Sequence, residues 1–80
     1  SMTNKEKYNQ AFKHIFTVED TVLNEDFSIL NIEKWDSVAH MGLISELEEA
    51  FDIMFDTDDI INFTSYTCGI DLLKKYGIEL

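Results

Sequence analysis

Apolar residues near the start of the chain recur at the spacing of a helix that turns by about 100° per residue. The stripe consists of Tyr8, Phe12, Ile15 and Phe16. Thr3 precedes Glu6 by three residues, which is the spacing of a capping box. The pattern predicts a first helix that begins at Thr3 and buries this mostly aromatic stripe.

The helical periodicity fades between residues 17 and 35. Asn24, Asp26, Ser28 and Asn31 favour turns in this segment. We expect a long ordered loop, anchored by apolar residues that point into the core. The candidate anchors are Val22, Leu23, Phe27, Leu30 and Ile32.

A second helical pattern runs from Asp36 to Ile53, with Asp36 or Ser37 at the N-cap or in the first turn. Its expected core face comprises Ala39, His40, Leu43, Ile44, Leu47, Ala50 and Phe51. The opposite face carries Glu46, Glu48 and Glu49. Val38 and Met41 fall on the same outer arc, close to Ser37. They either form part of a docking surface or are isolated surface residues of an ordinary kind.

Two shorter patterns follow. Residues 56–62 predict a short capped helix whose acidic residues favour its N-terminal dipole. Thr64 or Ser65 can cap a last helix that ends at Gly77. The inward stripe of that helix is Ile70, Leu73 and Tyr76. The chain is therefore predicted to be one all-α domain over residues 1–80, a four-helix bundle of three main helices and a short one.

Composition narrows the classes of partner. Sixteen acidic and six basic residues give a net charge of −10, which repels nucleic acid and anionic membranes and favours proteins with basic patches. The single cysteine, Cys68, cannot form an internal disulfide, no residues have metal-site spacing, and no apolar run has transmembrane length. We expect a cytoplasmic monomer, in which Ser1 is the remnant of a cleaved expression tag.

The sequence Asp36-Ser37-Val38, followed by an acidic helix that ends Leu47-Glu48-Glu49-Ala50-Phe51-Asp52-Ile53, resembles the signature of acyl carrier proteins. The resemblance covers essentially the whole chain and implies that fold. It also implies that Ser37 carries a covalent 4′-phosphopantetheine arm from coenzyme A. Asp36 would help to position the metal and cofactor of the modifying enzyme, a phosphopantetheinyl transferase. The chain would then be a substrate of enzymes and not itself an enzyme.

The expected docking surface for acyl-loading and acyl-processing enzymes combines apolar and acidic residues. Its members are Val38, Met41, Glu46, Glu48, Glu49, Asp56, Asp58 and Asp59. Fatty-acid carriers often have acids where this chain has Ala39 and Gly42, so a specialised member of the family fits as well. Fatty-acid, polyketide and related biosynthesis therefore remain open as pathways.

Three other functions are weighed against the acyl carrier. The first is a carrier of aminoacyl groups that serves an adenylating ligase. The second is an acidic helical adaptor without a prosthetic group. A serine hydrolase is disfavoured: His40 lies one turn from Ser37, but the chain has no Gly-rich nucleophile elbow and no residue to orient the imidazole.

Overall fold

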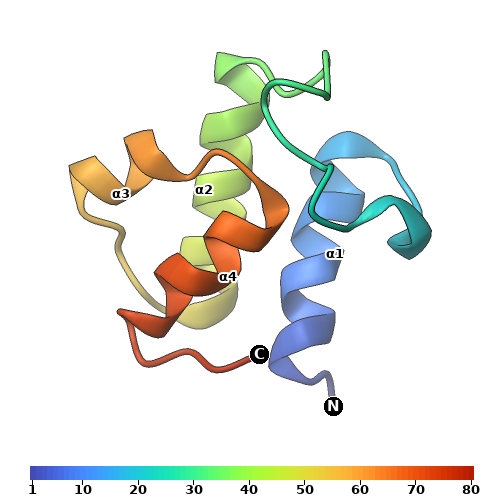
Figure 1. Ribbon diagram of the computed structural model, residues 1–80. Coiled ribbons are helices and arrows are strands. Elements are labelled where there is room, and N and C mark those ends of the chain that lie inside the picture. Colours follow the sequence, from blue (N-terminus) through green and yellow to red (C-terminus); the bar gives the residue numbers. More distant parts are fainter.

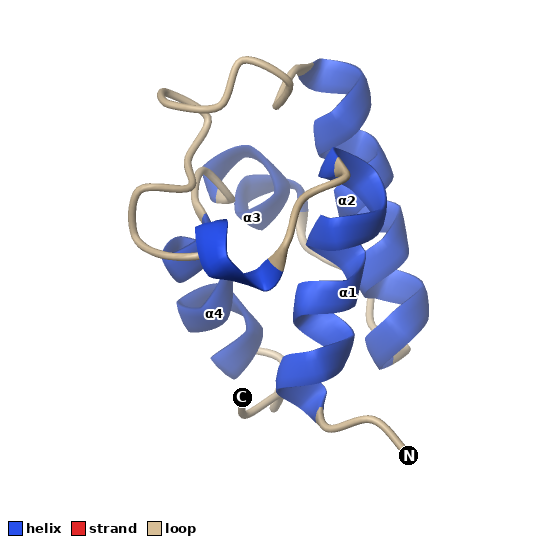
Figure 2. Cartoon of the chain, turned by 90° about the vertical axis from the view of Figure 1, so that its right-hand side faces the viewer, coloured by secondary structure: helices blue, strands red, loops and turns tan.

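Four helices and no strand make up the computed structural model, which describes residues 1–80. The helices are α1 (Asn4–Phe16), α2 (Ser37–Phe51), α3 (Thr57–Asn62) and α4 (Tyr66–Lys74), with a single 3₁₀ turn at Asp20–Val22. The α2 helix runs antiparallel to α1, and both chain ends lie at the same end of the molecule (Figures 1 and 2). The predicted all-α class, with three main helices and one short helix, is confirmed.

The ends of α1 and α2 follow from local sequence. At α1 the Thr3 hydroxyl accepts from the Glu6 amide at 3.1 Å, and the Glu6 carboxylate accepts from the Thr3 amide at 2.8 Å. The predicted capping box is thus confirmed, with Thr3 as the cap. Thr17 and Asp52 close the two helices in the left-handed conformation, with φ of 55° and 53°.

Aromatic side chains fill the core around Phe12. The Phe12 ring lies 5.0 Å from that of Tyr8 and 5.7 Å from those of both Phe27 and Trp35. Phe27 and Trp35 come from the long segment between α1 and α2, so this loop supplies part of the core. None of the three hollows on the surface is lined by Phe12 or Phe16.

The long loop is held to the start of α4 by backbone hydrogen bonds. The Ile29 amide donates to the Thr64 carbonyl at 3.0 Å, and the Tyr66 amide donates to the Phe27 carbonyl at 2.9 Å. Of the expected anchors, Phe27 is buried and Leu23 and Ile32 are half-buried. Val22 and Leu30 are exposed, by 44% and 96%, so the prediction that they point into the core is wrong.

The α2 helix buries Leu43, Ile44 and Leu47, as its periodicity predicts. Ala39, His40 and Phe51 are half-buried at the edges of this face. The expected burial of Ala50 is wrong. Ala50 lines an open hollow between α1 and α2, together with Met2 and Lys7.

Ser65 caps α4, since its hydroxyl accepts from the Cys68 amide at 3.0 Å. Tyr66, Gly69 and Leu73 form the buried side of α4, while Ile70 and Tyr76 are half-buried. The helix itself ends at Lys74, and the chain turns at Gly77, whose φ is +79°. The predicted cap of α3 is only partly present, because Asp56 occupies the N-cap position without a side-chain capping bond.

Candidate functional site

The turn that carries Ser37 is built by its neighbours. Asp36 is the N-cap of α2, and its carboxylate accepts from the Ala39 amide at 2.9 Å. Ser37 is the first helical residue and is exposed. Asp36 makes the capping bond, so the cap does not depend on the Ser37 hydroxyl. The exposed Ser37 lies at the positive end of the helix dipole.

A groove of about 390 Å³ opens beside Ser37. Its walls come from the long loop, the first turn of α2, and α3. Five of its residues are apolar or aromatic: Ile29, Trp35, Met41, Ile60 and Ile61. Asp36, Ser37 and His40 complete the lining. The arrangement places an accessible hydroxyl at the edge of a mostly apolar surface.

His40 is half-buried under this turn and is hydrogen bonded at both ring nitrogens. The Trp35 indole N–H lies 2.9 Å from His40 Nδ1, and His40 Nε2 lies 2.7 Å from the Ile60 carbonyl oxygen. An indole N–H can only donate, so Nδ1 accepts and Nε2 carries the proton. Neither nitrogen is free to accept a proton from Ser37.

The predicted docking residues fall into groups of different exposure. Val38 is 81% and Met41 49% exposed, in agreement with their predicted place on the outer face of α2. Glu49, Asp56 and Asp58 are also exposed. These five residues lie on the surface near α2 and the start of α3.

Glu46 and Glu48 are half-buried and already have partners within the chain. Glu46 pairs with His14 of α1. A Glu48 carboxylate oxygen accepts from the Phe55 amide at 3.0 Å, which fixes the connection between α2 and α3. Both carboxylates therefore hold the fold together as well as adding charge to the surface.

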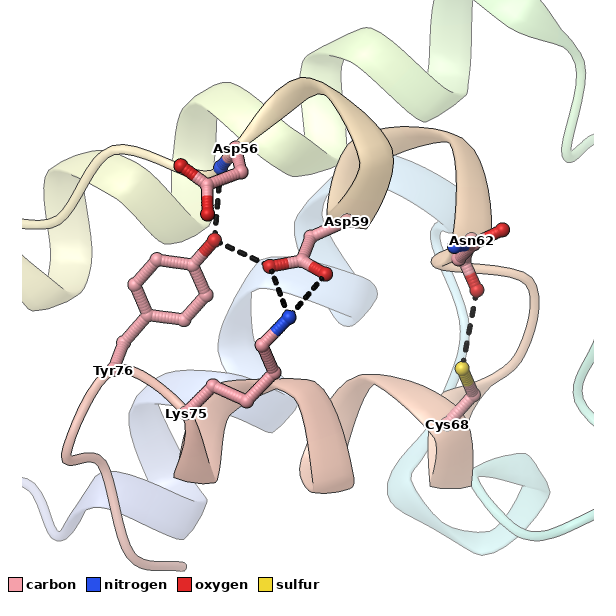
Figure 3. A network of polar contacts seen from close by, with 6 residues as sticks. All are labelled: Asp56, Asp59, Asn62, Cys68, Lys75 and Tyr76. Carbon is pink, nitrogen blue, oxygen red and sulfur yellow. Dashed lines mark hydrogen bonds and ion pairs between the residues drawn. The ribbon is translucent and has the colours of Figure 1, made fainter.

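Asp59 is the clear correction to the predicted docking surface, because only 3% of it is exposed. Its carboxylate accepts from Lys75 Nζ at 2.8 and 3.0 Å and from the Tyr76 hydroxyl at 2.6 Å (Figure 3). The Tyr76 oxygen in turn accepts from the Asp56 amide at 2.8 Å. This Asp59 cluster, consisting of Asp56, Asp59, Lys75 and Tyr76, fastens α3 to the end of α4.

The cluster also alters proton affinities. Hydrogen bonds from Lys75 and then Tyr76 lower the pKa of Asp59 from its ordinary value of 3.8. The hydrogen bond to Asp59 raises the pKa of Lys75, whose ordinary value is 10.5. Desolvation, followed by the hydrogen bond to Asp59, raises the pKa of Tyr76 above 10.0. All three shifts favour the protonation states that the network needs at neutral pH.

The sequence contains only a weak signal for the Asp59 cluster. Adjacent positions on a helix point about 100° apart, so Asp58 and Asp59 cannot share one face of α3. The partner Lys75 lies 16 residues further along the chain. Its position in space depends on the packing of α4.

No group of three or more His, Cys, Asp or Glu side chains is arranged to hold a metal ion. None of the helices combines the length and the apolar character needed to cross a membrane. Comparisons with protein-family models, curated proteins and solved structures find no match to this chain.

Proposed function

We propose that the protein is an acyl carrier that holds its cargo as a thioester on a 4′-phosphopantetheine arm attached to Ser37. The observation that carries the proposal is the exposed Ser37 hydroxyl in the first turn of α2, directly after a capping aspartate and beside an apolar groove. When bound, the arm supplies a terminal thiol that forms the thioester. The chain itself supplies attachment, orientation and recognition.

The residues around Ser37 suit a phosphodiester at that position. The free backbone amides of the first turn and the helix dipole favour an anion. Because Asp36 caps through its own carboxylate, modification of Ser37 removes no hydrogen bond of the cap. The apolar side chains of Ile29, Met41 and Ile61 offer a surface to the uncharged part of an arm or its cargo.

Recognition by partner enzymes would use the residues that remain exposed. Val38 and Met41 provide apolar contact next to Ser37, and Glu49, Asp56 and Asp58 provide charge for basic patches. The net charge of −10 steers such partners toward the protein over long range. A reducing compartment such as the cytoplasm fits the free Cys68 thiol.

The decisive experiment is incubation with coenzyme A and a promiscuous phosphopantetheinyl transferase. We expect the intact mass to rise by one phosphopantetheinyl group, and peptide fragmentation to place that mass on Ser37. Ser37→Ala should gain no mass. Ser45→Ala is the matched control and should be modified like the wild type, because Ser45 is an exposed serine further along the same helix.

Circular dichroism of each variant would show that the helices are intact. If folded wild-type protein gains no mass with several transferases, the carrier proposal fails. An acidic adaptor without a prosthetic group is then the better hypothesis. Modification of Ser37→Ala would also overturn the assignment. The mass of the thioester on protein isolated from its source would separate an acyl carrier from an aminoacyl carrier.

A further inference from the structure

His40 connects two separate parts of the protein. On one side, its Nδ1 accepts from Trp35, which stands immediately before the capping residue Asp36. On the other side, its Nε2 donates to the Ile60 carbonyl of α3. The centroids of the imidazole and of the Trp35 ring lie 6.2 Å apart, and the two planes are inclined by 28°.

The bond to Ile60 is important for the stability of α3, because this helix spans only six residues. A helix of that length is not stable on its own. The Ile60 carbonyl is among the last four of α3, which have no partner within the helix. His40 satisfies this carbonyl from the first turn of α2. It therefore joins the two walls of the groove beside Ser37.

We propose that His40 is a positioning residue, which in its neutral Nε2–H form holds α3 and the segment before Ser37 at a fixed separation across the groove. A second proton, on Nδ1, would place two N–H donors opposite each other. Either the Trp35–His40 bond would then open, or a part-buried indole N–H would lose its partner, and both outcomes disturb the turn before Ser37.

Few charged groups face this imidazole. On α2, Asp36 lines the groove with it. On α3, the carboxylate of Asp59 is turned toward Lys75 and Tyr76 instead. The long loop contributes Ile29 and Trp35, which are uncharged, and no lysine lines the groove. Protonation of His40 would consequently change mainly its contacts with its two hydrogen-bond partners.

Trp35 is the only tryptophan, so its fluorescence reports on the bond directly. A protonated imidazole quenches a neighbouring indole, so a pH series of the emission follows the contact between His40 and Trp35. We expect a one-proton change of emission in the wild type. The change should be absent from His40→Asn and His40→Gln. His14→Asn is the matched control, since His14 is the only other histidine and pairs with Glu46 on the surface.

Two further measurements separate positioning from a general role in folding. Nitrogen NMR of the imidazole at neutral pH should show the proton on Nε2. Among the variants, His40→Gln can still donate to Ile60 and should leave amide exchange in α3 close to that of the wild type. His40→Asn loses that donor, so its α3 amides should exchange faster. A proton found on Nδ1, or an unchanged pH response in His40→Asn, would overturn the proposal.

The consequence for loading rests on the proposed carrier function. A misplaced Ser37 turn should lower kcat/KM for the transferase by about tenfold in His40→Asn, while His14→Asn keeps the wild-type value. Equal loading of His40→Asn and wild type would refute the positioning of Ser37. If the wild type is not loaded at all, the carrier proposal fails, and the fluorescence and NMR results alone decide the role of His40.

Discussion

Replacing Gly69 by alanine tests how closely α4 packs against the aromatic core. A Cβ atom added at Gly69 would lie 2.7 Å from Phe63 Cε1, and closer still to Phe63 Cζ and to the Tyr8 hydroxyl. Both rings are fully buried, with 0% exposure, so a shift of either ring must displace other core side chains. The Tyr8 hydroxyl also donates to the Tyr66 carbonyl at 2.7 Å, so displacing the ring would break a buried hydrogen bond.

The expected loss of stability combines three effects. Overpacking a core costs about 1–3 kcal/mol, and leaving the Tyr8 hydroxyl and the Tyr66 carbonyl unpaired costs about 1–3 kcal/mol. Alanine recovers about 1 kcal/mol through its higher helix propensity. The net loss is about 3 kcal/mol. At roughly 0.05–0.15 kcal/mol per residue, a domain of 80 residues has about 4–12 kcal/mol of stability, so the substitution removes a large part of it.

Gly42→Ala is the matched control, because the substitution is the same and the site is also helical. There, the added Cβ meets only the terminal methyl of Ile15, at 3.1 Å, and the half-buried Ile15 side chain can shift. We expect Gly42→Ala to be as stable as the wild type or up to about 1 kcal/mol more stable.

Urea unfolding followed by Trp35 fluorescence and circular dichroism gives both free energies. A free energy of unfolding for Gly69→Ala within about 0.5 kcal/mol of the wild-type value would contradict the close packing of α4. Equal destabilisation of Gly42→Ala and Gly69→Ala would contradict it as well.

Further predictions concern the cap of α2 and the Asp59 cluster. In urea unfolding, Asp36→Ala should cost about 1 kcal/mol because it removes the capping oxygen, whereas Ser37→Ala should stay within about 0.5 kcal/mol; equal losses would assign the cap to both residues. The lowered pKa of Asp59 stabilises the fold above its ordinary value of 3.8, and this contribution is lost as the pH falls through the still lower folded value. The raised pKa of Lys75 stabilises the fold below 10.5, and that contribution is lost as the pH rises through the higher folded value. The difference in unfolding free energy between wild type and Asp59→Asn should therefore be constant between these limits and shrink beyond both. A difference that stays constant across the whole pH range would show that Asp59 and Lys75 do not stabilise the fold as an ion pair.

Elements with local signals could be predicted from the sequence. The capping box of Thr3 and Glu6 lies within three residues, and the stripe of α1 repeats within one helix, so both are visible without knowledge of the fold. The N-terminal boundary of α2 at Asp36 and Ser37 follows from the same short-range chemistry. The position of Ser37 at the start of α2, next to Asp36, could therefore be predicted from the sequence.

Features that depend on distant partners could not be predicted in the same way. A loop has no fixed period, so nothing local distinguishes the buried Phe27 from the exposed Leu30. The burial of Asp59 depends on Lys75 and Tyr76, which approach it only once α4 has packed. Counting acids along the chain therefore overestimates the charge that is available to partners.

The position of α3 depends on three polar attachments along its length. At its C-terminal end, the Asn62 carbonyl accepts from Cys68 Sγ of α4 at 3.1 Å (Figure 3). The Asp59 cluster holds its N-terminal half, and the pKa directions of its members keep that attachment intact from acid pH up to strongly alkaline pH. His40 holds the Ile60 carbonyl from the first turn of α2. The other attachments come from α4 and its end, so loss of the His40 bond alone would leave α3 fastened to α4. A substitution of His40 should therefore change the groove beside Ser37 while the core stays folded.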